Sequence, residues 1–61
     1  MRTYTLTVFE QTGEKLLDET FEAANNEEAK EVGKAILEEK QYEEHTHRCV
    51  SPEAKLVLFH S

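Results

Sequence analysis

Nearly all of the 61 residues fall into one pattern: two strand-like runs, one amphipathic helix and two further strand-like runs. This pattern leaves little chain for an active-site loop, a cofactor motif or a long tail. We therefore predict an α+β fold, ββαββ, in which residues 1–61 form a single domain. A domain of this size is near the lower limit for a core that folds without a disulfide or a metal, so we expect modest stability.

The first two strands are predicted from the alternation of apolar and polar residues. In residues 3–10, Leu6 and Val8 share one face with an aromatic residue, and threonines occupy the other. This period of two is typical of a strand with one buried face. Residues 15–23 are more polar, which suits an edge strand. Gly13 lies between the two runs, where a hairpin turn favours a left-handed residue.

The helix is predicted to begin at Asn25. Its side chain can accept a hydrogen bond from the Glu28 amide, and Glu28 can reach back, as in a capping box. Gly33 lies on the apolar stripe, where it predicts a close approach of the helix to the sheet, and the helix should end around residues 40–42. The stripe comprises Ala29, Val32, Gly33, Ile36 and Leu37.

The strand order is predicted from the remaining two runs. Residues 45–50 are short and polar, residues 51–54 form a turn around Pro52, and residues 55–60 are apolar at both parities. A strand that is apolar on both faces is usually central. We therefore favour a four-stranded mixed sheet of order 2-1-4-3, with the first and fourth strands parallel at its centre and one helix packed on one face. The order 1-2-3-4 is the alternative.

Five segments together resemble the YhzD-like family, whose members are short cytoplasmic proteins of Bacillus-type bacteria. The resemblance implies a cytoplasmic, single-domain protein and no assigned reaction or functional residue. The segments are Tyr4-x-Leu-x-Val-Phe9, Phe21-Glu22-Ala23-Ala24-Asn25, Thr46-His47-Arg48-Cys49, Ser51-Pro52-Glu53 and Leu56-Val57-Leu58-Phe59.

Charge and cysteine content limit the location and the partners. The formal net charge of −6 disfavours binding to a phosphate backbone, so we expect no nucleic-acid partner. No apolar run approaches the length of a membrane span, so we expect no membrane partner either. Cys49 is the single cysteine, which excludes an intramolecular disulfide and fits a reducing, cytoplasmic environment.

The histidines form the first candidate site. If the second hairpin places Cys49 opposite Leu56, the same register places His45 opposite His60 and leaves His47 on the same face. His45, His47 and His60 would then be candidate ligands for zinc, with the Cys49 thiol beside them. The alternative is that His47 and Cys49 pack beneath the helix while the other two histidines lie at the rim. Zinc is therefore an alternative, and we otherwise expect no cofactor.

The face of the sheet away from the helix forms the second candidate site. Phe9, Val57 and Phe59 should point away from the helix if Leu56 and Leu58 point toward it. An exposed apolar group on a small sheet suggests a contact surface for a partner protein or a second copy of the chain. The alternative is that these are scattered surface residues, which need no explanation.

Catalysis is the least favoured function. Cys49 as a nucleophile would require a cationic, partly exposed environment, whereas it lies in a strand of an acidic protein. A domain with a single helix also offers little concave volume. We expect a small domain that binds a protein partner or itself, with a metal-binding module as the alternative.

Overall fold

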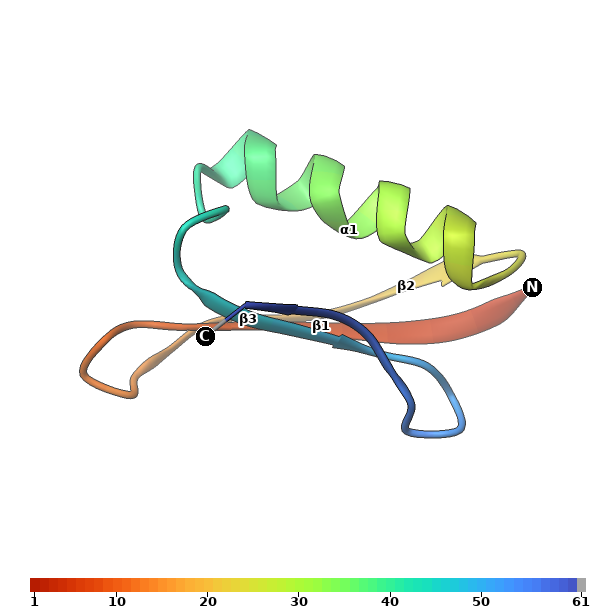
Figure 1. Ribbon diagram of the computed structural model, residues 1–61, viewed down its shortest axis with the longest axis horizontal. Coiled ribbons are helices and arrows are strands. Elements are labelled where there is room, and N and C mark those ends of the chain that lie inside the picture. The colour runs from red at the N-terminus through yellow and green to blue at the C-terminus, as the bar shows by residue number, and fades with distance from the viewer. Residues whose placement is uncertain (61) are drawn as a thin grey trace.

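The computed structural model describes residues 1–60, which form one antiparallel sheet covered on one face by one helix (Figure 1). The predicted ββαββ order of elements is confirmed. The two hairpin loops lie at opposite ends of the sheet (Figure 1). The elements are β1 (Arg2–Phe9), β2 (Lys15–Ala23), α1 (Asn26–Lys40), β3 (Thr46–Val50) and β4 (Leu56–His60).

The strand order is β2-β1-β3-β4, so both predicted orders are wrong. β1 pairs antiparallel with β3, and no parallel pair occurs among residues 1–60. The polar β3 is central because its side chains His47 and Cys49 are buried, at 7% and 0% exposure. β4 forms an edge because it pairs with β3 alone among the described strands, and its residues Leu56 and Phe59 are exposed. Apolar residues at both parities of β4 therefore reflect an exposed apolar surface rather than a central position.

The core lies between α1 and the sheet. Three alternate β1 side chains, Tyr4, Leu6 and Val8, are fully buried, as their spacing predicts. Leu6 is paired with Cys49 of β3, which places the thiol on the same face. Every strand and the helix contribute to this cluster, whose buried members are Tyr4, Leu6, Val8, Leu17, Ala23, Ala29, Leu37, Cys49 and Val57.

The ends of α1 are set by local hydrogen bonds. Asn25 is the N-cap, and its side chain accepts from the Glu28 amide at 2.8 Å, as predicted. Glu28 reaches back to accept from the Ala24 amide at 2.8 Å. At the other end, Gln41 adopts a left-handed conformation with φ 61° and closes the helix without a glycine. Nothing helical within residues 1–60 combines the length and hydropathy that crossing a bilayer requires.

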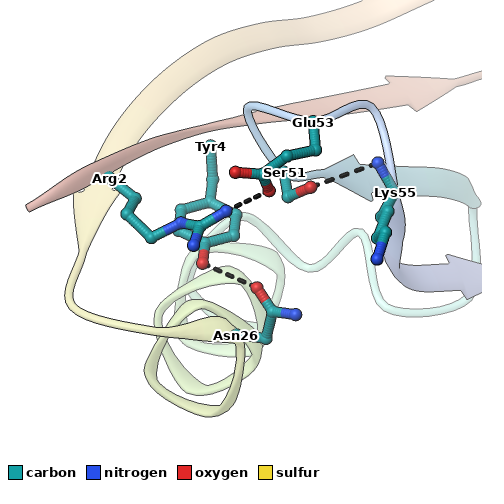
Figure 2. A network of polar contacts seen from close by, with 6 residues as sticks. All are labelled: Arg2, Tyr4, Asn26, Ser51, Glu53 and Lys55. Atoms are coloured by element: carbon teal, nitrogen blue, oxygen red, sulfur yellow. Dashed lines mark hydrogen bonds and ion pairs between the residues drawn. The ribbon is translucent and has the colours of Figure 1, made fainter.

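Polar contacts join β1 to the helix and to the β3–β4 turn (Figure 2). The hydroxyl of Tyr4 donates to Asn26 Oδ1 at 2.7 Å, which ties the middle of the core to the first turn of α1. Arg2 forms an ion pair with Glu53. In the turn itself, Ser51 Oγ accepts from the Lys55 amide at 3.1 Å. These contacts hold the N-terminal end of β1 against elements that lie far away in the sequence.

The β3–β4 hairpin does not have the register that we predicted. Val50 pairs with Leu56, and a register shift then leaves Val57 unpaired, so that Cys49 lies opposite Leu58 rather than Leu56. The shift is a bulge, which adds one residue to β4. It turns Leu56 to the open face, together with Val50, while Leu58 still faces the helix. The predicted orientation of Leu56 toward the helix is therefore wrong.

Candidate functional site

The observed register brings two of the three candidate metal-binding histidines together. His47 of β3 lies directly opposite His60 of β4. Their rings are stacked, with centroids 5.4 Å apart and an interplanar angle of 20°. Both residues lie on the helix side of the sheet, because they share the parity of Cys49 and Leu58.

His47 is held in one orientation by its surroundings. The residue is buried, and its Nδ1 donates to the backbone carbonyl of His45 at 2.9 Å. Burial lowers the pKa of His47, an effect that outweighs the hydrogen bond to His45, and the positive charge of a protonated His60 acts in the same direction as burial. His47 is therefore neutral at physiological pH, and its Nε2 carries the free lone pair.

His45 does not join the other two histidines. It precedes β3, and its Nε2 lies 3.0 Å from Glu10 Oε1 at the end of the β1–β2 hairpin. Its ring also contacts Tyr42, with centroids 5.1 Å apart. The predicted pairing of His45 with His60 is wrong because the turn and the bulge each move the register by one residue, so that His60 lies opposite His47. Across residues 1–60, the structure brings no three metal-ligating side chains close enough to hold an ion.

A groove of about 350 Å³ lies beside the paired histidines, between the C-terminal half of α1 and β4. We call it the histidine groove. It contains two carboxylates, those of Glu38 and Glu43. Both carboxylates share the groove with His47 and His60 because of the register of the β3–β4 hairpin, and no local sequence signal predicts this register. The groove is lined by Lys34, Leu37, Glu38, Glu43, His47, Leu58, Phe59 and His60.

Cys49 is separated from solvent and does not line the histidine groove. Its side chain is fully buried in the core, opposite Leu6 and Leu58. Burial raises the pKa of the Cys49 thiol to about 11. At neutral pH the sulfur is therefore protonated, so it is a poor nucleophile and a poor metal ligand.

The predicted contact residues of the open face have different environments. Phe59 is 55% exposed and Phe9 is half-buried, and both lie on the side away from Leu6 and Val8. Val57 is buried, at 9% exposure, so its predicted place on the open face is wrong. The cause is the bulge, which removes Val57 from the pairing and turns it into the core.

Leu56 takes the place that was predicted for Val57. It is 56% exposed, and the register places it on the open face with Phe59. Sequence alternation alone misses Leu56, because it assigns residues 56 and 58 to the same face. Leu56 and Val57 exchange their predicted environments at the bulge, and the bulge depends on the non-local pairing of β3 with β4.

The open face has a polar half and an apolar half. Two rows of paired residues cross it, and in each row the β2 and β1 members are polar while the β4 member is apolar. The apolar half lies at the β4 edge, and Phe9 lies apart from it on β1. The rows are Thr20–Thr5–Val50–Leu56 and Asp18–Thr7–Arg48–Phe59.

Comparison with known proteins places the chain in a family. The model of the YhzD-like protein family matches residues 1–61, and the chain belongs to that family. The uncharacterised protein YhzD of Bacillus subtilis (strain 168) is 50% identical over 60 residues, which cover 98% of each chain. No solved structure matches the chain. The family resemblance that the five sequence segments carry is thus confirmed.

Proposed function

We propose that the protein is a non-catalytic cytoplasmic domain that binds an extended segment of another protein along β4. The observation that carries this proposal is the exposure of Leu56 and Phe59, at 56% and 55%, on one short edge strand. Exposed apolar groups that cluster at one place mark contact surfaces more often than scattered ones. An edge strand also presents unpaired backbone amides and carbonyls to a partner.

The two edges of the sheet differ in a way that supports this choice. β2 carries four charged residues, Lys15, Asp18, Glu19 and Glu22, whereas β4 carries no aspartate, glutamate, lysine or arginine. Charged side chains on an edge strand oppose pairing with another strand. β2 therefore has the character of a protected edge, and β4 has the character of an edge that accepts a strand.

The partner's chemistry follows from the same surface. A strand added to β4 gains backbone hydrogen bonds, and its alternate side chains contact Leu56 and Phe59 on the open face. We therefore infer a partner segment that is apolar at alternate positions. β4 of a second copy meets this description, because pairing of two β4 strands brings no charged side chains of these strands together.

The remaining parts of the proposal rest on charge and burial. The net charge of −6 disfavours a nucleic-acid partner. The non-catalytic assignment is supported by the burial of Cys49, whose thiol is the strongest nucleophile that the sequence offers.

The test compares capture by immobilised wild-type protein with capture by a Leu56→Ser/Phe59→Ser variant. A Thr5→Ser/Thr20→Ser variant changes the polar half of the same face and is the matched control. We expect captured proteins to be lost in the first variant and kept in the second. Sedimentation equilibrium of all three proteins tests the version in which the partner is a second copy.

Retention of the same proteins by the Leu56→Ser/Phe59→Ser variant would show that β4 is not the working surface. So would a wild-type protein that captures nothing and stays monomeric at every concentration tested. Circular dichroism checks that both variants remain folded, which is expected because the substituted side chains of β4 are exposed.

A further inference from the structure

The histidine groove borders β4, the edge strand along which the partner strand is proposed to bind. It lies between β4 and the C-terminal half of α1, and among residues 1–60 β4 pairs with β3 alone. Neighbouring strands of a sheet lie about 4.8 Å apart, and alternate side chains of a strand point to opposite faces. A strand that pairs with β4 therefore directs every second side chain to the helix side of the sheet, beside the groove. Its other side chains face Leu56 and Phe59 on the open face.

Most polar side-chain atoms of the groove are hydrogen-bond acceptors. His47 is only 7% exposed, and its Nδ1 donates to the His45 carbonyl, which leaves Nε2 as an acceptor. Within residues 1–60 no group donates to this Nε2, yet no fully buried side-chain nitrogen or oxygen there lacks a partner. The Nε2 atom therefore opens into the groove that His47 lines. The carboxylates of Glu38 and Glu43 are further acceptors, and neither forms an ion pair within the described residues.

The charges around the groove favour a cation. Lys34 is the one lysine or arginine of the lining, against the two carboxylates of Glu38 and Glu43. Glu38 also belongs to the last turn of α1, and the C-terminal end of a helix carries a partial negative charge. Lys34 is exposed, so its ammonium group can extend into solvent. A cationic side chain that enters the groove is therefore attracted by it.

We propose that the histidine groove binds an arginine side chain of the partner strand that pairs with β4. This inference rests on the proposed function and adds a basic position to the partner segment, on the face opposite its apolar residues. A guanidinium group carries five N–H donors and no acceptor, which matches the acceptors of the groove. It is also planar and stacks on aromatic rings. The His60 ring is stacked on His47 by one face, and because His60 is exposed its other face is accessible.

The arginine requirement selects another protein over a second copy as the partner. β4 contains no arginine or lysine, so pairing of two β4 strands brings no cationic side chain of these strands to either groove. The net charge of −6 also favours a basic partner over a second acidic chain. The inferred partner segment is therefore extended, apolar at alternate positions and basic at one position between them.

The experiment compares the affinities of three capped nine-residue peptides by calorimetry. Each alternates threonine with valine, and its central threonine is replaced by arginine, lysine or citrulline, which is the neutral isostere of arginine. Wild-type protein should bind the arginine peptide about tenfold more tightly than the citrulline peptide, because hydrogen bonds between charged groups are the stronger ones. A Glu38→Gln/Glu43→Gln variant should lose this preference. A Glu39→Gln/Glu44→Gln variant changes the net charge equally outside the groove lining and should keep it.

A second titration tests the groove without a strand. Acetyl-arginine amide is added to isotopically labelled protein, and the imidazole resonances are followed. We expect the ring signals of His47 and His60 to shift in the wild type and also in the Leu56→Ser/Phe59→Ser variant, which removes the proposed contacts on the open face. The same variant should bind all three peptides more weakly.

The outcomes separate this inference from the proposed function. Equal affinities of the arginine and citrulline peptides for the wild type would overturn the inference and leave strand binding at β4 intact. Ring shifts with acetyl-arginine amide, without binding of any peptide, would overturn strand binding and keep the groove as a guanidinium site. The absence of both responses would overturn both proposals.

Two further outcomes would overturn the assignment of the groove. Equal loss of the arginine preference in Glu38→Gln/Glu43→Gln and Glu39→Gln/Glu44→Gln would reduce the effect to net charge. A lysine peptide that binds as tightly as the arginine peptide would show that no guanidinium group is recognised. All four glutamates are exposed, so neither variant is expected to unfold the domain.

Discussion

Gly33 of α1 lies directly against Leu58 of β4: a Cβ atom added to the glycine would lie 2.9 Å from Leu58 Cδ1. This is the close approach of helix and sheet that a glycine on the apolar stripe predicts. It also explains how an edge strand with two exposed apolar residues stays attached to the core. Leu58 supplies the contact from β4 to α1, while Leu56 and Phe59 face the other way.

Substitution of Gly33 should show a balance of two effects. Gly33→Ala gains about 1 kcal/mol of helix propensity, but the new methyl group must displace the Leu58 methyl, so we expect a net change below about 0.5 kcal/mol. In a Leu58→Ala background the same substitution should stabilise by about 1 kcal/mol. Gly33→Val should destabilise by about 1–3 kcal/mol. Urea unfolding of the four variants measures these differences. Equal effects of Gly33→Ala in both backgrounds would contradict the contact.

The hydrogen bond between Tyr4 and Asn26 is predicted to stabilise the domain by about 1 kcal/mol. The 2.7 Å bond joins a fully buried side chain of β1 to the first turn of α1 (Figure 2). Tyr4→Phe keeps the ring and its stacking on Phe21, and removes only the hydroxyl. A double-mutant cycle with Asn26→Ala isolates the bond from the packing. A coupling energy of zero would mean that water replaces the lost partner without cost.

The locally determined features of this fold were predictable from the sequence. Alternation fixes β1, and the spacing of Asn25 and Glu28 fixes the start of α1, because each signal lies within a few residues of the chain. Gly13 adopts φ 94° at the hairpin where a left-handed residue was predicted. Each of these features depends on neighbours in the sequence alone.

The strand order and the site were not predictable, because both depend on non-local pairing. A strand that is apolar on both faces can be a central strand or an edge strand with an exposed apolar surface. The burial of His47 and Cys49 of β3 on the helix side distinguishes the two positions, and no local pattern predicts it. One extra residue in β4 exchanges the environments of Leu56 and Val57. Together with a turn that is one residue longer than predicted, the bulge replaces the expected His45–His60 pair with His47–His60. A period of two cannot reveal a bulge of one residue.

The C-terminus of α1 offers a stabilising substitution. Gln41 has φ 61°, a conformation that glycine adopts without the steric cost that a Cβ imposes. We expect Gln41→Gly to raise the free energy of unfolding by about 0.5–1 kcal/mol. Ala35→Gly, at an exposed position inside the helix, is the control and should lower it by about 1 kcal/mol. Thermal and urea unfolding measure both. A loss of stability in both variants would show that the left-handed cap carries no strain.

The buried thiol of Cys49 should make stability fall at high pH. The pKa of Cys49 is about 11 in the folded chain, against 9.0 for an unperturbed thiol. Between these values the unfolded chain loses the thiol proton while the folded chain keeps it, so the free energy of unfolding declines as pH rises. The contribution is complete below pH 9.0 and is lost by about pH 11, a loss on the order of 2 kcal/mol.

The matched variant for this prediction is Cys49→Ala, because lysines and tyrosines also titrate in this range. Cys49→Ala lowers the stability of the core at every pH, but the difference between wild type and variant should shrink as pH rises through this interval. The alkylation rate of the wild-type thiol at neutral pH gives a second measurement. It should be far below that of free cysteine and should rise with urea, because the sulfur reacts only when the core opens. Alkylation as fast as that of free cysteine in the absence of urea would mean that β3 does not lie beneath α1.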